Sequence, residues 1–422
     1  MVAGASGAAA PEAGEVPDAP LLIVGASMAG LRTAEGARRA GYTGPITFLG
    51  AEAHAPYNRP PLSKELLQTE GQGHADVAFP IRSALEEGVT WVLGRSAVSL
   101  DTEHKVVVDD AGDEHPYSAL VIATGLRPKP LPIDDHGLGG IHVLRTLDDA
   151  VALREVLRPG ANVVILGSGF VGCEIAATAA KNGATVSVVT QSRVPLLRAV
   201  GPLLGAELRR RHEEHGVRFF TGESLFGLVG DPSVERVILT SGVMLECDVL
   251  VVAVGSDPNT EWLASSGLDV SDGVLVDGGL RAVGVDGVVR PDVFAVGDVA
   301  RYPNPLFDDV ARRVEHWNLP TETGKRAGQL IAAHLAGDDC EPLAAAGFAP
   351  LPSFWSDQYD AHLLAFGMTY LADRSELVAG SPDDECVVEF YRGDALVGVC
   401  GIGMRSAVQA YRTRFAAPAA AV

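Results

Sequence analysis

The chain has 422 residues, of which 47% are hydrophobic, so it is long enough for two or three domains with large cores. Its formal net charge of −21 argues against a general binder of nucleic acid or of anionic membranes, and we expect neither partner. No apolar run reaches the roughly 18 residues that indicate a membrane-spanning helix. Residues 1–17 are rich in Ala, Gly and Pro and lack the basic start of a signal peptide. We therefore expect a disordered leader and a cytoplasmic protein.

A short apolar run that ends in a glycine-rich turn occurs twice. Residues 21–30 are LLIVGASMAG and residues 163–172 are VVILGSGFVG, and second apolar runs follow at 46–49 and 186–189. Each copy predicts a βαβ unit whose helix N-terminus binds a pyrophosphate. Two copies predict two dinucleotides on one chain, which is typical of a two-nucleotide flavoprotein.

The first turn departs from the usual fingerprint at its middle position. Gly25 makes the sharp turn and Gly30 allows close helix packing, whereas Ser27 replaces the middle glycine and offers a hydroxyl to a phosphate oxygen. After the second strand, Glu52 is a candidate acceptor for ribose hydroxyls, with a solvated loop acid as the alternative. The candidate binding residues of the turn are Gly25, Ala26, Ser27, Ala29 and Gly30.

The segment 50–67, GAEAHAPYNRPPLSKELL, contains the adjacent prolines Pro60 and Pro61, which stiffen the backbone before a helix that Ser63 or a neighbour can cap. It resembles the corresponding stretch of the NADH-dependent ferredoxin reductases that serve bacterial oxygenases, of the putidaredoxin reductase and biphenyl dioxygenase reductase types. Rubredoxin reductase and apoptosis-inducing factor share their fold. The resemblance implies that Arg59 and Lys64 contact FAD and that Lys64 lies beside the flavin.

Further segments carry the same resemblance. Residues 120–128, LVIATGLRP, end a buried strand in a turn common to most such flavoproteins, and residues 287–298, GVVRPDVFAVGD, match the second FAD motif. The resemblance implies that Val98 presents backbone to the adenine and that Asp298 contacts the ribityl chain. The FAD contacts implied by these segments are Val98, Ala123, Thr124, Gly125, Arg145, Gly297 and Asp298.

Two tryptophan-containing segments resemble the nicotinamide side of the family site. Residues 313–318, RVEHWN, match a segment whose backbone reaches the flavin pyrimidine and whose indole lies at the nicotinamide and ferredoxin side. Residues 354–359, FWSDQY, match a C-terminal signature. The implied contacts are Glu315, His316, Trp317 and Trp355, with a core role as the alternative for the tryptophans.

The second turn is a full G-x-G-x-x-G, and Glu174 follows in the first turn of its helix. The resemblance implies that Glu174 pairs with Lys64 when two domains close, so we expect an ion pair near flavin N5. An acid there would keep the ammonium in place and charged, to stabilise negative charge on the flavin. Lys64 and Glu174 are thus the catalytic candidates, and the turn adds the binding candidates Gly167, Gly169, Phe170, Val171 and Gly172.

The strand at 186–189 is followed by Thr190, where the family has an acid that bonds the ribose and repels a 2′-phosphate. Arg193 lies three residues further on. We expect NADH as the donor, with NADPH not excluded. The other candidate residues of this region are Gln191, Arg198 and Gly255, the last in a segment that resembles the family's return to the FAD domain.

The predicted fold is α/β, with two Rossmann-like dinucleotide-binding domains of the glutathione-reductase type and a C-terminal α+β interface domain. We expect the leader at 1–17, the FAD-binding domain at 18–130 and 256–328, the NAD(P)H-binding domain at 131–255 and the C-terminal domain at 329–422. In the last domain, residues 386–392 and 395–399 alternate as antiparallel strands do.

The positions of the cysteines limit which electron acceptor the protein can use. The chain contains Cys173, Cys247, Cys340, Cys386 and Cys400. Their spacing predicts neither a metal site nor a redox-active disulfide, and residues 20–130 contain none, which excludes disulfide-reductase and peroxidase chemistry there. A [2Fe–2S] ferredoxin that feeds an oxygenase, such as a haem monooxygenase, is the expected acceptor. Rubredoxin is the alternative, and a binding or signalling role like that of apoptosis-inducing factor is another.

Because such ferredoxins are acidic, as this chain is, we expect a local basic patch near the flavin edge. The same arginines could instead form solvated salt bridges. The oligomeric state stays open between monomer and dimer. The candidate patch residues are Arg301, Arg312, Arg313, Arg405 and Arg412.

Overall fold

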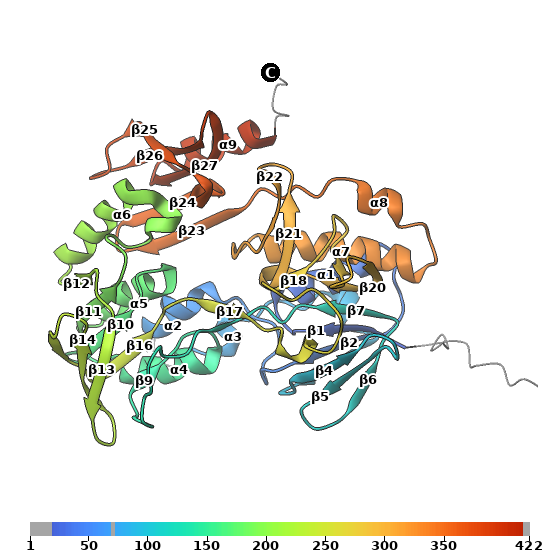
Figure 1. Ribbon diagram of the computed structural model, residues 1–422, viewed down its shortest axis with the longest axis horizontal. Coiled ribbons are helices and arrows are strands. Elements are labelled where there is room, and N and C mark those ends of the chain that lie inside the picture. Colours follow the sequence, from blue (N-terminus) through green and yellow to red (C-terminus); the bar gives the residue numbers. More distant parts are fainter. Residues whose placement is uncertain (1–18, 69–71, 417–422) are drawn as a thin grey trace, which may run out of the picture.

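The computed structural model describes residues 19–68 and 72–416, so the expected leader at 1–17 lies outside the described residues. Three large sheets organise this part of the chain, and we call them the first, second and third sheets in chain order. The first lies on the right of Figure 1, the second on the left in green, and the third above the second in red.

The first sheet has six strands in the order β19–β20–β7–β1–β2–β3. All pairs from β20 to β3 are parallel, and β19 is antiparallel to β20. The helices α1 and α7 pack side by side against it (Figure 1). The bounds are β1 Leu21–Val24, α1 Met28–Arg39, β2 Ile46–Gly50, β3 Val89–Leu93, β7 Ala119–Ile122, β19 Arg281–Val283, β20 Val289–Ala295 and α7 Leu319–Leu335.

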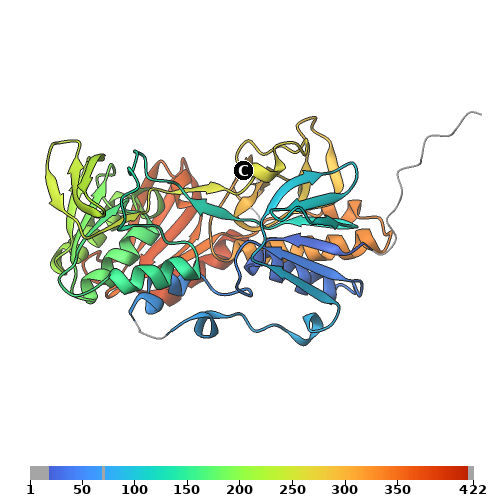
Figure 2. The same cartoon turned by 90° about the horizontal axis from the view of Figure 1, so that it is seen from below.

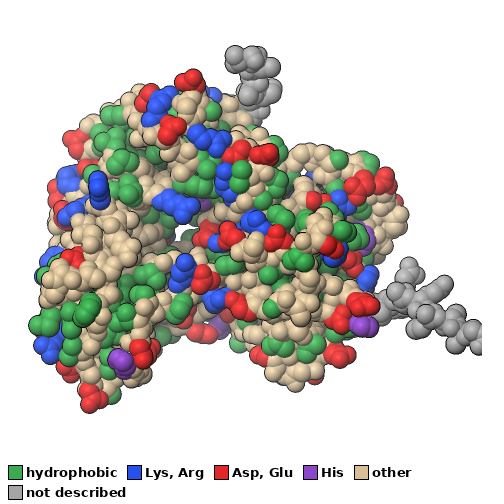
Figure 3. All heavy atoms as spheres, in the orientation of Figure 1, with side chains coloured by type: hydrophobic (Ala, Val, Ile, Leu, Met, Phe, Trp, Pro, Cys, Tyr) green, Lys and Arg blue, Asp and Glu red, His purple; other side chains and the backbone are tan. Residues whose placement is uncertain are grey.

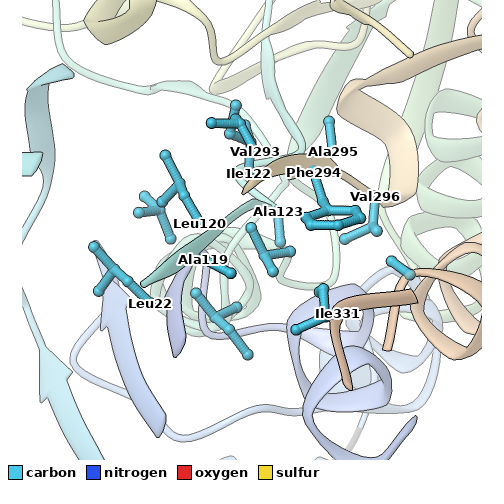
Figure 4. Packing of buried hydrophobic residues seen from close by; sticks show 14 of the residues in the cluster. Leu22, Ala119, Leu120, Ile122, Ala123, Val293, Phe294, Ala295, Val296 and Ile331 are labelled. Atoms are coloured by element: carbon cyan, nitrogen blue, oxygen red, sulfur yellow. The ribbon is translucent and has the colours of Figure 1, made fainter. Parts of the chain in front are cut away.

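The core of the first sheet explains why its strands are apolar throughout. All four residues of β1 and of β7 are buried, because helices and a smaller sheet cover both faces of a parallel sheet. Figure 4 shows Phe294 of β20 beside Ile331 of α7, whereas Leu22 of β1 and Leu120 of β7 lie on the other face of the sheet. The central strands are therefore held rigidly at the edge where their glycine turns begin.

Smaller elements complete this part of the molecule. The antiparallel sheet β4–β5–β6 adds Leu100 and Val107 to the same core, and β17 pairs with β8 where the chain returns from the second sheet. The bounds are β4 Ala97–Asp101, β5 Val106–Asp109, β6 Glu114–Pro116, β8 Leu126–Pro128, β17 Ser256–Pro258, β18 Val274–Leu275, β21 Ala300–Asn304, β22 Asp308–Arg312, α8 Glu341–Ala345, and the 3₁₀ helices η2 Ser83–Leu85, η3 Glu261–Leu263 and η4 Gly297–Val299.

The second sheet has five parallel strands in the order β12–β11–β10–β16–β9. A three-stranded antiparallel sheet, β13–β14–β15, packs on it through the core around Val164 and Val237. The bounds are β9 Ile141–His142, α4 Leu147–Val156, β10 Asn162–Leu166, α5 Phe170–Lys181, β11 Thr185–Thr190, α6 Leu197–Glu214, β12 Arg218–Thr221, β13 Leu225–Gly230, β14 Val234–Leu239, β15 Met244–Glu246 and β16 Val249–Val252.

The segment from Tyr57 to Gln68 does not pack on the first sheet, although the sequence assigned it to the FAD-binding domain. Leu62, Leu66 and Leu67 of this segment join the core of the second sheet. Figure 2 shows the chain that follows this segment, in light blue, running back along the lower edge of the molecule to the first sheet. The short helices here are η1 Pro60–Ser63, α2 Glu65–Gln68 and α3 His74–Val77. The domain bounds remain a prediction.

The third sheet is antiparallel, in the order β23–β24–β27–β26–β25. It contains the two strands predicted from alternation, which the structure places at 386–392 and 395–402. The bounds are β23 Ser353–Gln358, β24 Ala361–Gly367, η5 Thr369–Leu371, β25 Arg374–Gly380, β26 Cys386–Arg392, β27 Ala395–Ile402 and α9 Arg405–Ala416. Across residues 19–68 and 72–416, no helix has the length and apolar character needed to cross a membrane.

Candidate functional site

A cavity of about 710 Å³ begins at the turn after β1 and extends to the contact between the three sheets. It lies at the carboxyl ends of β1, β2 and β7, where open α/β sheets bind their ligands. The predicted residues that line it are Gly25, Ala26, Ser27, Ala29, Glu52, Arg59, Lys64, Ala123, Thr124, Gly125, Arg145, Phe170, Val171, Glu174, Gly297, Asp298, Glu315, His316, Trp317 and Trp355.

The turn after β1 can hold a phosphate group. Gly25 has φ +120°, and a Cβ there would lie 2.2 Å from the carbonyl oxygen of Ala123. Gly30 does not line the cavity, but a Cβ there would lie 2.4 Å from the carbonyl oxygen of Gly25. Ser27 precedes α1, and its hydroxyl caps none of the described backbone N–H groups. The helix N-terminus and this hydroxyl therefore face the cavity as donors for an anion.

Glu52 is held in place by two donors. The Tyr57 hydroxyl donates to Oε2 at 2.5 Å and Arg59 Nη2 to Oε1 at 2.6 Å. The Tyr57 oxygen in turn accepts the backbone N–H of Leu147 at 2.9 Å. Burial raises the pKa of Tyr57, so this phenol stays protonated. Tyr57 is a cavity residue that the sequence analysis missed, although it lies inside the segment that carries the resemblance.

Charged side chains from three distant segments meet in the cavity. The Arg145 guanidinium lies 3.7 Å from the Asp298 carboxylate. Burial raises the pKa of Asp298, and Arg145 offsets this only in part. Burial also lowers the pKa of Arg145, followed by the nearby charge of Arg59, which donates to the Arg145 carbonyl oxygen at 2.5 Å. The predicted residues Arg59, Arg145 and Asp298 therefore form one cluster.

The predicted ion pair between Lys64 and Glu174 is present, with Nζ and Oε2 2.6 Å apart. Two hydroxyls also donate to this carboxylate, from Ser63 at 2.5 Å and from Ser356 at 2.6 Å. Glu174 belongs to α5 beside the second sheet, whereas Ser356 belongs to β23 of the third sheet. Both serines were missed as site residues, although each adjoins a motif residue, and Glu174 is their common acceptor.

Two tryptophans stand at the mouth of the cavity. The Trp317 and Trp355 rings meet edge to face, with centroids 4.8 Å apart, and their side chains are 38% and 37% exposed. The Trp317 indole N–H donates to Asn58 Oδ1 at 3.2 Å. Beside them, burial lowers the pKa of His316 to about 4, and its Nδ1 has no hydrogen-bond partner among the described residues. A neutral ring nitrogen is thus left for a ligand.

The glycines of the second turn lie outside this cavity, at the carboxyl end of β10, although Phe170 and Val171 of the same turn line it. Gly167 has φ +100°, and a Cβ there would lie 2.2 Å from the carbonyl oxygen of Ala253. A Cβ on Gly172 would lie 2.3 Å from the carbonyl oxygen of Gly167. Gly169, the residue before α5, has nothing within 4 Å of such a Cβ, and no side chain caps this helix among the described residues. This helix N-terminus is therefore also open to an anion.

The region after β11 has no acid at its first position. Thr190 is buried, and its hydroxyl lies 2.8 Å from that of Ser168. Gln191 donates to Ser224 at 2.8 Å instead of facing the cavity. The Arg198 guanidinium lies 5.3 Å above the Tyr370 ring, so it packs on the third-sheet side.

Two further predicted residues lie away from the cavity. Val98 is half exposed and does not line it, whereas its neighbour Ala97 does, because successive side chains of a strand point to opposite faces. Gly255, with φ +111°, lies near the Lys129 side chain at the crossing between the two sheets and shapes the backbone there.

Comparison with known proteins identifies the family. The family model described as pyridine nucleotide-disulphide oxidoreductase matches residues 19–324, and the one described as reductase C-terminal matches residues 353–421. The chain belongs to the pyridine nucleotide-disulphide oxidoreductase family. As a member of this family it is an oxidoreductase that uses FAD and NAD(H).

Similar proteins share nearly the whole length of this family member. The anthranilate 1,2-dioxygenase system ferredoxin–NAD(+) reductase component of Burkholderia cepacia is 35% identical over 86% of this chain and 85% of its own. The rubredoxin–NAD(+) reductase of Pseudomonas putida is 31% identical over 89% and 94%. The covalent putidaredoxin reductase–putidaredoxin complex matches with a TM-score of 0.85 and 27% identity over 94% and 93%.

The residues fit both cofactors. The open N-terminus of α1, the non-capping Ser27 hydroxyl and the His316 nitrogen, which has no partner among the described residues, all lie along one cavity of about 710 Å³. The open N-terminus at Gly169 offers a second pyrophosphate site beside it.

Proposed function

We propose that this protein passes electrons from NADH through FAD to a [2Fe–2S] ferredoxin that feeds an oxygenase. The observation that carries the proposal is that no cysteine lines the cavity among residues 19–68 and 72–416. All five cysteines are free, and Cys173, which adjoins Glu174, is fully buried with its thiol directed to the Ser168 carbonyl oxygen. Burial raises the pKa of Cys173, so no reactive thiolate is available. The acceptor must therefore come from outside the chain.

The chemistry divides between cofactor and protein. FAD, when bound, accepts a hydride from the nicotinamide and releases electrons singly. Lys64 supplies positive charge at the end of the cavity nearest α5, and Glu174 holds this ammonium in one position. Per turnover, one NADH reduces two ferredoxins by one electron each and releases one proton. The exposed Trp317 and Trp355 give an external carrier a short approach to the cavity.

The nucleotide site supports weak discrimination between NADH and NADPH. Thr190 stands where a ribose-binding acid would repel a 2′-phosphate. We expect Thr190→Glu to raise the preference for NADH, measured as the ratio of the two kcat/KM values, by roughly tenfold. Thr221→Glu, at the end of the neighbouring strand β12, serves as the matched control. An unchanged ratio in Thr190→Glu would contradict this assignment.

One assay tests the whole proposal. The purified yellow protein is mixed with NADH, and cytochrome c reduction is followed with and without a [2Fe–2S] ferredoxin. Strong dependence on ferredoxin is the expected result. Rapid flavin bleaching without ferredoxin-dependent turnover would overturn the proposed acceptor. Rubredoxin would then be tested next, because rubredoxin reductase is among the similar proteins.

The third possible outcome of the assay is that of a signalling flavoprotein, which would oxidise NADH slowly and keep a long-lived charge-transfer complex.

We also propose a cytoplasmic location, because the five free cysteines fit a reducing compartment. Cell fractionation with antibody detection tests the location, and recovery with a periplasmic marker would contradict it.

A further inference from the structure

The arginines expected to form a docking patch are mostly neutralised within the chain. Arg301 lies 3.0 Å from Asp269, Arg313 lies 2.8 Å from Asp272, and Arg312 pairs with Asp308. On the face of the molecule that Figure 3 shows, Lys and Arg side chains are interspersed with Asp and Glu. Three of the five expected cations are thus held in ion pairs, and the other two, Arg405 and Arg412, lie on α9.

A second hollow, of about 320 Å³, lies between α1, α7 and the residues before η2, and we call it the α1–α7 groove. Trp317 lines both this groove and the large cavity, so a partner in the groove lies next to the cavity mouth. The charged residues that line it are Arg32, Arg39, Arg82, Lys325, Glu35 and Glu322. Four cations against two acids leave a local charge of +2, in a chain whose net charge is −21.

Glycines bring the two helices together and fix the positions of these cations. A Cβ on Gly324 would lie 2.8 Å from the carbonyl oxygen of Ala29, and one on Gly328 would lie 2.5 Å from that of Thr33. Larger residues at these positions would force the helices apart. Arg39 of α1 and Lys325 of α7 both line the groove, and both are exposed.

The cations of the groove differ in how firmly they are paired. The buried Glu35 carboxylate holds Arg32 at 2.9 Å and Arg82 at 3.3 Å, although the Arg82 side chain is 58% exposed. Lys325 lies 3.3 Å from Glu322 with both side chains about half exposed. Arg39 is exposed and has no ion pair within residues 19–68 and 72–416. Positive charge therefore remains available at the solvent edge.

We propose that the α1–α7 groove is the docking surface for an acidic iron–sulfur electron carrier. The proposal rests on the proposed function and adds the place where its acceptor binds. A carrier with a negative surface is repelled by most of a chain of net charge −21, so a local positive groove selects where it can approach. Trp317 at the end of the groove then brings the carrier next to the reduced cofactor.

The test is charge reversal at Arg39 and Lys325, two exposed residues that line the groove but not the large cavity. We expect Arg39→Glu together with Lys325→Glu to raise the KM for the ferredoxin by at least roughly tenfold at low ionic strength. The matched control is Arg158→Glu, another exposed arginine that lines neither hollow. Arg405→Glu tests the exposed arginine of the expected patch at the start of α9. The probe is the [2Fe–2S] ferredoxin that gives the highest turnover in the cytochrome c assay.

Salt gives a second readout. The dependence of kcat/KM on ionic strength should flatten in the double variant, because fewer attractive charges remain to be screened. Reduction of ferricyanide by NADH should stay unchanged, since this small acceptor needs no docking surface. The neutral variant Arg39→Gln with Lys325→Gln provides the same comparison with a smaller effect if the double reversal folds poorly.

The possible outcomes separate the two proposals. A ferredoxin KM and salt dependence that stay at the wild-type values in the double variant would overturn the groove and leave the proposed function intact. A larger effect from Arg405→Glu than from the double variant would place docking at α9 and overturn the groove as well. Normal ferricyanide reduction by the wild-type protein with no [2Fe–2S] ferredoxin accepted would overturn both proposals.

Discussion

The Lys64 ammonium lies 2.6 Å from the Glu174 carboxylate although the two residues are 110 positions apart in the chain. The same carboxylate accepts the hydroxyls of Ser63 and Ser356. An acid with three donors is fixed in direction as well as in charge. Lys64 is thereby held at the cavity wall instead of extending into solvent.

Removing the charge of this pair should slow hydride transfer. We expect Lys64→Ala to lower the rate of flavin reduction by NADH by roughly 100-fold, because positive charge placed where negative charge develops stabilises the transition state. Stopped-flow flavin bleaching measures this rate. Lys181→Ala, at the far end of α5, is the control. Unchanged bleaching at normal FAD content would show that Lys64 has no part in the reaction.

Ser356 should act through Glu174. Its side chain is fully buried, and removing a hydrogen bond to a charged group costs roughly 1.5–3 kcal/mol. We therefore expect Ser356→Ala to lower the free energy of unfolding by about that amount and also to slow flavin reduction. Ser353→Ala, on the same strand, should do neither. A loss of stability with normal pre-steady-state flavin reduction would reduce Ser356 to a purely structural role.

Gly25 should tolerate no side chain. Gly25→Ala places a Cβ 2.2 Å from a backbone oxygen, and the backbone of β7 cannot move away inside a packed sheet. We expect a loss of FAD content and of stability beyond the roughly 1 kcal/mol that a positive φ costs alone. Gly41→Ala isolates that cost, because Gly41 has φ +100° and open space around it. Equal thermal unfolding of the two variants would contradict the steric argument.

A buried histidine should make stability depend on pH. Burial lowers the pKa of His212 from 6.5 to about 4, so the folded state keeps this ring neutral. The ring's stabilising effect is therefore complete above pH 6.5 and is lost as the pH falls toward 4. Replacing it should reduce the loss of stability between pH 7 and 5 by on the order of 2 kcal/mol.

Urea unfolding of the wild type and of His212→Gln at the two pH values measures this difference. The exposed His136→Gln is the control, since its side chain is 73% exposed. Parallel pH dependences in the wild type and His212→Gln would show that His212 does not set the acid sensitivity.

The features that could be predicted from the sequence are those that a short motif determines. The glycine turns at Gly25 and Gly167, and the Lys64–Glu174 pair, follow from motifs with a fixed backbone geometry or from a resemblance that carries one. Ser356 could not be assigned, because its contact with Glu174 joins segments 182 residues apart and leaves no periodic signal.

The pairing of the docking arginines could not be predicted for a related reason. Arg301 and Arg313 are paired with acids about 30 and 40 residues away, and a count of charges along the chain cannot reveal such pairing. The α1–α7 groove likewise appears only when two helices almost 300 residues apart are packed together. Charge placement on the surface is thus a tertiary property.

The segment that carries Lys64 is attached to α5 and not to the first sheet. Thr178 donates to the Ser63 carbonyl oxygen at 2.9 Å, Asn182 donates to that of Leu67 at 3.1 Å, and Leu62, Leu66 and Leu67 belong to the core of the second sheet. If the second sheet rotated against the first during turnover, Lys64 and Glu174 would travel together. The Lys64–Glu174 ion pair would then be present whether the domains were open or closed. A rotation would move the ammonium, together with α5, toward or away from the flavin site.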